Sequence, residues 1–247
     1  MATSDLQHRC ATIRGQLSQA GLFPAVPEQA LGPDAATSTT TWRIAVTPFA
    51  LTQDQFDFFL QLGPQLLAFY RTLNRLYADS LRGLQPSWVA EYLDRGKPEG
   101  LLTYSRMKRF RDQLPAVIRP DIIPTQDGMV ITELDSVPGG IGLTACLSHA
   151  YSDTFAQHST PSMLHLELIG GRNGMVRGFA SMLQSAQAQH NGCVAILVSE
   201  EAKYYRPEMT WLAAQLREQG MPAWCVEPRE IRFTEEGLRL QTDSGEQ

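Results

Sequence analysis

The chain is poor in lysine and cysteine, and both shortages narrow its chemistry. Its 247 residues include eighteen arginines but only three lysines, Lys97, Lys108 and Lys203. The four cysteines are Cys10, Cys146, Cys193 and Cys225. They lie far apart and form no CxxC motif, which argues against a thiol zinc site or a redox pair and predicts reduced thiols.

Several diagnostic motifs are also missing. No His-x3-His pair is present to suggest zinc, and no GxSxG elbow is present to suggest a serine hydrolase. No segment approaches the roughly 18 consecutive apolar residues of a membrane span. The first ten residues lack the apolar stretch of a secretory signal. We therefore expect a cytoplasmic protein with no membrane partner.

The composition is that of a globular protein. Hydrophobic residues make up 43% and charged residues 19% of the chain. The net charge of -5 gives no general electrostatic reason to bind nucleic acid. A metal-bound nucleotide is still compatible with this charge, because local carboxylates can hold the metal.

Helical periodicity dominates the first two thirds of the chain. Thr52 and Gln55 form a capping-box pattern that opens a helix, and Pro64 suits the first residue of a second helix. Ser87 is expected to cap a short helix that ends at Gly96. The expected helices are 5–19, 52–60, 64–81, 87–93, 101–113 and 143–155. Residues 161–189 are expected to hold more helix, interrupted at 170–174.

The last third predicts a strand–helix–strand unit. Residues 193–198 are a continuous apolar run, 207–219 are helical up to Gly220, and 222–226 form a second strand parallel to the first. Residues 231–241 predict a hairpin that turns at 235–237. Near the N-terminus, 42–46 is compatible with a strand, and the proline- and threonine-rich remainder of 1–50 indicates an arm or linker.

A pair of strands in the middle of the chain carries four alternating charges. Arg119 and Asp121 lie on one face of the first strand, and Glu133 and Asp135 on one face of the second. A two-residue loop at Asp127-Gly128 would separate the acids across the sheet. A three-residue loop at 126–128 would pair Asp121 with Glu133 and Arg119 with Asp135. We favour the three-residue loop.

That register has two interpretations. Facing carboxylates about 5 Å apart repel each other unless a cation lies between them, and Mg²⁺ commonly binds one or two protein carboxylates together with substrate phosphates. Arg119 would then hold a phosphoryl oxygen. The other interpretation is an exposed ladder of salt bridges, which contributes little to stability. Taken alone, the hairpin favours the ladder.

A family resemblance favours the metal interpretation. Arg119-x-Asp121, then Glu133-x-Asp135 followed by Pro138-Gly139, resembles the metal-binding strands of circularly permuted ATP-grasp enzymes, the group of glutathionylspermidine synthase-like proteins. In that family the second strand often reads Glu-x-Asn, so Asp135 is a departure. The resemblance extends over about 52–241, including the segment Tyr204–Glu208 between a strand and a helix.

The resemblance implies a fold, a reaction and a set of site residues. It implies a mixed α/β (α+β) fold with an arm at 1–50, a partial ATP-grasp-like domain at 51–165 and a small Rossmann-like (pre-ATP-grasp) domain at 166–247. It implies an ATP-dependent ligase that joins a small-molecule carboxylate and amine through an acyl phosphate. Asp121, Glu133 and Asp135 would bind Mg²⁺, and Arg119 the reacting phosphate of ATP.

In that family the lysines that bind ATP lie further along the chain, beyond the segments that this sequence resembles. We therefore expect the sequence to be the front portion of such an enzyme, or a half-enzyme that needs a partner chain. The alternative is a non-catalytic binding or scaffold module that kept the fold and lost the chemistry.

A glycine-rich turn follows the hairpin. Gly139, Gly140 and Gly142 precede a helix, and their N–H groups could bind an anion such as a phosphate of the cofactor. The interpretation we favour is a tight turn that lets the strand enter the helix.

Overall fold

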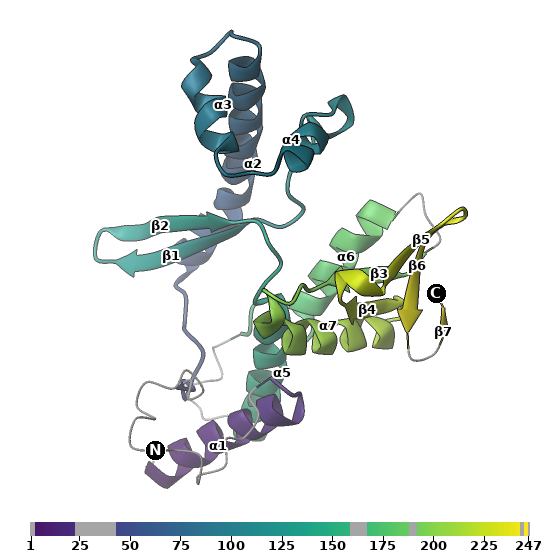
Figure 1. Ribbon diagram of the computed structural model, residues 1–247. Coiled ribbons are helices and arrows are strands. Elements are labelled where there is room, and N and C mark those ends of the chain that lie inside the picture. The colour runs from purple at the N-terminus through teal and green to yellow at the C-terminus, as the bar shows by residue number, and fades with distance from the viewer. Residues whose placement is uncertain (1–2, 23–42, 159–166, 188–191, 243–244, 247) are drawn as a thin grey trace, which may run out of the picture. The chain divides into compact units, whose positions relative to one another are not determined.

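A computed structural model of the protein describes residues 3–22, 43–158, 167–187, 192–242 and 245–246, in a mixed α/β fold (Figure 1). The chain forms two compact units, one made of Leu51–Val137 and the other of Met1–Ala50 with Pro138–Gln247. We call them the hairpin unit and the βαβ unit. The chain passes between these units at 50/51 and at 137/138. The domains implied by the resemblance, 51–165 and 166–247, stay a prediction.

A single long helix organises the hairpin unit. Helix α2 (Gln53–Leu81) begins with the expected capping box, in which Gln55 N–H donates to Thr52 Oγ1 and Thr52 N–H to Gln55 Oε1 over 3.3 and 2.9 Å. The expected break at Pro64 is wrong, because Pro64 lies inside the helix. Proline removes one backbone hydrogen bond, and the buried Leu62 and Leu66 on either side of it keep α2 anchored.

Two short helices follow α2, and the first of them packs against it. They are α3 (Ser87–Asp94) and α4 (Glu99–Ser105), followed by the 3-10 turn η3 (Lys108–Phe110) in place of one expected helix over 101–113. Ser87 is not the cap, since Pro86 holds that position. The buried Ser80 of α2 fixes α3, because its hydroxyl donates to Pro86 O and accepts from Ala90 N–H. The unit ends in the antiparallel hairpin β1 (Arg119–Thr125) and β2 (Gly128–Asp135).

The N-terminal helix belongs to the core of the βαβ unit. Helix α1 (Thr3–Gln19), suggested by the sequence, packs on α5 (Ile141–His158) through Ile13, Leu17, Cys146 and Ala150. Residues 43–46 do not form the strand considered from the sequence. Instead, the carbonyl of Ile44 accepts from the Cys10 thiol and that of Ala45 from the Tyr151 hydroxyl, at 3.5 and 2.7 Å. Residues 23–42 of the expected arm lie outside the described residues.

The expected strand–helix–strand unit is confirmed. Strand β3 (Val194–Leu197) pairs in parallel with β4 (Ala223–Val226), and α7 (Arg206–Glu218) connects them after the 3-10 turn η5 (Lys203–Tyr205). Leu212 and Leu216 of α7 are fully buried.

The expected C-terminal hairpin is confirmed too, by β5 (Ile231–Thr234) and β6 (Gly237–Thr242). The 3-10 turn η6 (Pro228–Glu230) precedes it, and β7 (Gly245–Glu246) pairs with β6. Helix α6 (Gly174–Gln187) lies within the expected helical region, of which 161–166 and 188–189 lie outside the described residues. Among the described helices, none is both long and apolar enough to cross a membrane.

Helices α5 and α7 approach so closely that glycine is required at their contact. A Cβ on Gly142 would overlap the backbone carbonyl of Glu208. A Cβ on Gly139 would lie 2.7 Å from the ring of Tyr205. The glycines after the hairpin therefore serve packing against the start of α7.

We expect Gly142→Ala to lower the free energy of unfolding by about 1–3 kcal/mol, the usual cost of overpacking, because the obstacle is backbone. Urea unfolding of the full chain measures this. Gly178→Ala in α6 is the matched control: nothing lies within 4 Å of the added Cβ, so helix propensity should make it neutral or stabilising by up to about 1 kcal/mol. Equal effects of the two substitutions would contradict the close contact.

Candidate functional site

The charged residues of the hairpin pair as expected from the sequence, but the loop length and the strand geometry behind this pairing differ from the expectation. Arg119 pairs with Asp135 and Asp121 with Glu133, as predicted. The loop, however, contains two residues, Gln126 and Asp127, rather than three. A β-bulge at the Asp121/Ile122 step adds one residue to β2 and restores the register of the charged pairs.

Arg119 and Asp135 form an ion pair at the base of the hairpin. Arg119 Nη1 donates to Asp135 Oδ2 over 2.7 Å and to Val137 O over 3.3 Å. Val137 N–H donates to the other carboxylate oxygen over 2.8 Å. These contacts lower the pKa of Asp135, first through the Val137 N–H and then through the charge of Arg119.

Asp121 and Glu133 lie two pairs further along the hairpin and are both exposed. Within the described residues, neither carboxylate makes a hydrogen bond or an ion pair. Two facing carboxylates without a cationic partner suit Mg²⁺, which completes its shell with water and phosphate oxygens. The donor set therefore fits a hard divalent cation. In the described part of the chain, however, His, Cys, Asp and Glu form no group of three or more that could hold a metal.

Asp135 thus differs from Asp121 and Glu133 in its hydrogen bonds. Both of its oxygens already accept hydrogen bonds, one of them from Arg119. The salt-bridge interpretation therefore describes the Arg119–Asp135 pair, and the carboxylates open to a cation are those of Asp121 and Glu133.

The glycine turn that follows the hairpin binds the side-chain carboxylate of Glu208. Gly140 N–H donates to Glu208 Oε1 and Leu143 N–H to Glu208 Oε2, both over 2.7 Å. Glu208 is buried, and Gly140 has a φ of +83°, a conformation that glycine adopts readily. The carboxylate thus caps the positive end of α5. The N–H of Gly140, considered from the sequence for cofactor binding, is engaged by this internal ligand.

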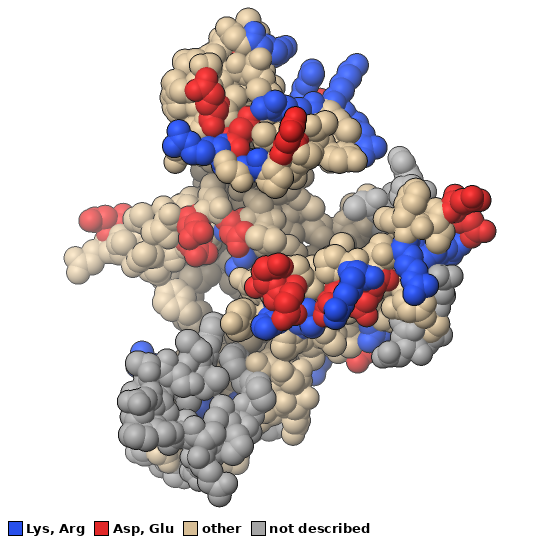
Figure 2. All heavy atoms as spheres, viewed as in Figure 1, with Lys and Arg blue, Asp and Glu red and all other residues tan. Residues whose placement is uncertain are grey.

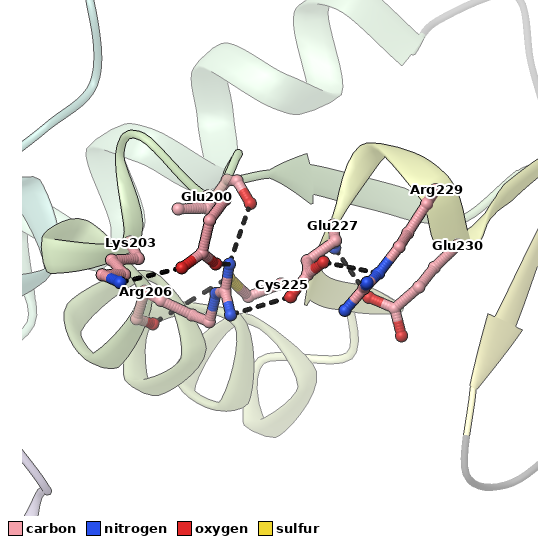
Figure 3. Close-up of polar contacts among 8 residues, drawn as sticks. Glu200, Lys203, Arg206, Cys225, Glu227, Arg229 and Glu230 are labelled. Carbon is pink, nitrogen blue, oxygen red and sulfur yellow. Dashed lines mark hydrogen bonds and ion pairs between the residues drawn. The ribbon is translucent and has the colours of Figure 1, made fainter.

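A second charged cluster lies where the parallel strands end (Figure 3). Arg206 Nη1 lies 2.9 Å from Glu227 Oε1, and its Nη2 lies 3.6 Å from Glu200 Oε2. Lys203 pairs with Glu200 over 2.8 Å and Arg229 with Glu227 over 2.7 Å. Open α/β sheets commonly bind ligands at this edge. Here three bases pair with two acids, so the charges at this edge are largely compensated within the protein. A third acid, Glu230, accepts a hydrogen bond from the Glu227 N–H.

The sequence did not reveal these two arrangements. Glu208 looks like an ordinary acidic residue in the first turn of a helix, and its role depends on a helix more than 60 residues away. Arg206 was noted only as part of a resembling segment, whereas the structure shows it between acids at the ends of β3 and β4.

A scan against protein-family models found no match, and a search of curated proteins found no match either. The functional argument therefore depends on the residues of this chain.

We expect Arg119→Gln to raise the pKa of Asp135, because the guanidinium stabilises the carboxylate. The pKa should stay below its ordinary value, since the Val137 N–H is the largest lowering cause. In the unsubstituted chain the lowered pKa stabilises the folded state above the unfolded pKa of Asp, about 3.9. This stabilisation is lost as the pH falls through the lower, folded value. Carbon-detected NMR titration of the carboxyl group measures the pKa, and an unchanged value in Arg119→Gln would contradict the pair.

We expect Glu208→Gln to destabilise the βαβ unit by about 1–3 kcal/mol, because the amide can accept only one of the two buried N–H donors. Amide hydrogen exchange at Gly140 and Leu143 gives the local measurement and should accelerate at one or both sites. Glu218→Gln, exposed at the end of the same helix, is the control and should change neither quantity. Unaltered exchange in Glu208→Gln would mean that the cap does not protect α5.

Proposed function

We propose that the chain is part of an ATP-dependent carboxylate–amine ligase of ATP-grasp type, with its metal-binding residues on the β1–β2 hairpin. The observation that supports this proposal is the register that sets Asp121 opposite Glu133 and, two pairs further, Arg119 opposite Asp135. A cation-binding pair and a phosphate-binding arginine thereby lie on one face of the hairpin. The resemblance of the hairpin sequence to the ATP-grasp strands agrees with this arrangement.

In this proposal each hairpin residue has a distinct task. Asp121 and Glu133 bind Mg²⁺ through exposed carboxylate oxygens. Arg119 offers its guanidinium to a phosphate oxygen of ATP, and Asp135 holds that guanidinium in position until the phosphate arrives. Asp135 would be open to Mg²⁺ as a third ligand only if Arg119 released it. Mg²⁺, when bound, neutralises charge on the phosphate oxygens during phosphoryl transfer to a substrate carboxylate.

The glycine turn has a structural task in the same proposal. Because Glu208 engages the N–H of Gly140, the phosphate-binding role goes to Arg119 and not to Gly140. The close approach of the Tyr205 ring explains why position 139 holds a glycine.

The competing function is a non-catalytic binding or scaffold module. The Arg119–Asp135 ion pair favours it, since a closed salt bridge stabilises a hairpin without any metal. The ligase requires Asp121 and Glu133 to bind Mg²⁺, whereas the scaffold module does not.

We expect Glu133→Gln to weaken Mg²⁺ binding at least about tenfold, because it removes one of two charged ligands, with little loss of stability at an exposed site. Titration calorimetry with MgCl₂, with and without ATP, measures the affinity, and thermal unfolding measures stability. Asp127→Asn is the matched control, since this acid is in the loop of the same hairpin and outside the charged pairs. Equal Mg²⁺ affinity in Glu133→Gln and the unsubstituted chain, or no Mg²⁺ binding at all, would leave the scaffold function.

A further inference from the structure

The hairpin unit contains a cavity lined mainly by arginine. Its volume is about 480 Å³, and its polar lining consists of Arg71, Asn74, Arg75, Arg82, Arg111 and Asp112. Figure 2 shows Lys and Arg side chains in blue over the helices of this unit. The cavity lies apart from the four hairpin residues, none of which lines it.

The sequence of α2 explains how three of the arginines meet. Arg75 follows Arg71 by four residues and Arg82 follows Arg75 by seven, and both spacings return to the same side of a helix. The fourth arginine, Arg111, comes from the segment after η3. This segment is tied to α2, because Asn74 Nδ2 donates to Gln113 O over 3.0 Å. The two walls of the cavity are therefore held together by a specific hydrogen bond.

The charges in the cavity are only partly compensated. Asp79 pairs with Arg75 over 3.7 Å and also with Arg82. Arg71 and Arg111 make no ion pair with any described carboxylate, and Asp112 is the only acid in the lining. Arginine cannot relieve the repulsion by losing its proton. The cavity keeps a positive surplus in a chain whose net charge is -5.

We infer that this arginine cavity binds a small-molecule polyanion carrying at least two phosphate groups. The planar guanidinium fork matches phosphate oxygens in pairs, and arginines from opposite walls can hold two groups at once. The volume falls within the range of small-molecule sites. Recognition needs no metal, because the positive charges are side chains. Because no hairpin residue lines the cavity, this site is separate from the Mg²⁺ site proposed on the hairpin.

The test uses inorganic pyrophosphate as the probe, with the full chain in EDTA-containing buffer so that a metal site cannot contribute. Calorimetry should show saturable one-to-one binding. Arg71→Gln and Arg111→Gln, made separately, should each weaken it about tenfold or more, as expected for loss of a charge-assisted hydrogen bond. Both side chains are exposed, and circular dichroism confirms that each variant is folded.

The matched control is Arg95→Gln, an exposed arginine of the same unit outside the cavity, which should leave the affinity unchanged. Equal weakening by Arg95→Gln would show general charge attraction and overturn the inference. Orthophosphate binding as tightly as pyrophosphate would overturn the requirement for two groups. Absence of pyrophosphate binding would overturn the site itself, and none of these outcomes bears on Mg²⁺ binding by Asp121 and Glu133.

Discussion

The βαβ unit depends on one buried carboxylate. Glu208, in the first turn of α7, accepts hydrogen bonds from the Gly140 and Leu143 N–H groups at the start of α5. Two helices far apart in the sequence are thereby joined near their N-terminal ends, and the contact is close enough to exclude a side chain at Gly142. Because α5 also carries the contact with α1 and α7 connects β3 to β4, this carboxylate links the N-terminal helix to the parallel strands.

Local signals in the sequence predicted local structure well. The Thr52–Gln55 capping box, the apolar run before the α7 helix and the turn before Gly237 all correspond to observed elements. The errors arose where tertiary contacts override a local rule. Pro64 is accommodated within α2, which Leu62 and Leu66 anchor, and residues 43–46 satisfy carbonyls through Cys10 and Tyr151 instead of a neighbouring strand.

The candidate site was only partly predictable for the same reason. The pairing of Asp121 with Glu133 followed from alternation and loop length, although the actual loop is one residue shorter and the bulge adds that residue back. The Arg119–Asp135 pair followed from the same register. The cap by Glu208 and the arginine cavity could not be predicted from the sequence. Each joins segments that lie close together only in the folded chain.

The bulge in β2 has a consequence for how this hairpin can change length during evolution. With the observed loop and no bulge, Thr132 would face Asp121, and Glu133 would pass to the other face. Loss of residue 132 would therefore produce a regular ladder in which the two acids still face each other. Loss of a residue from the two-residue Gln126–Asp127 turn, by contrast, would force the strands into another register and separate the two acids. The residue that this hairpin can lose without separating its two acids is thus the bulged Thr132, not a residue of the turn.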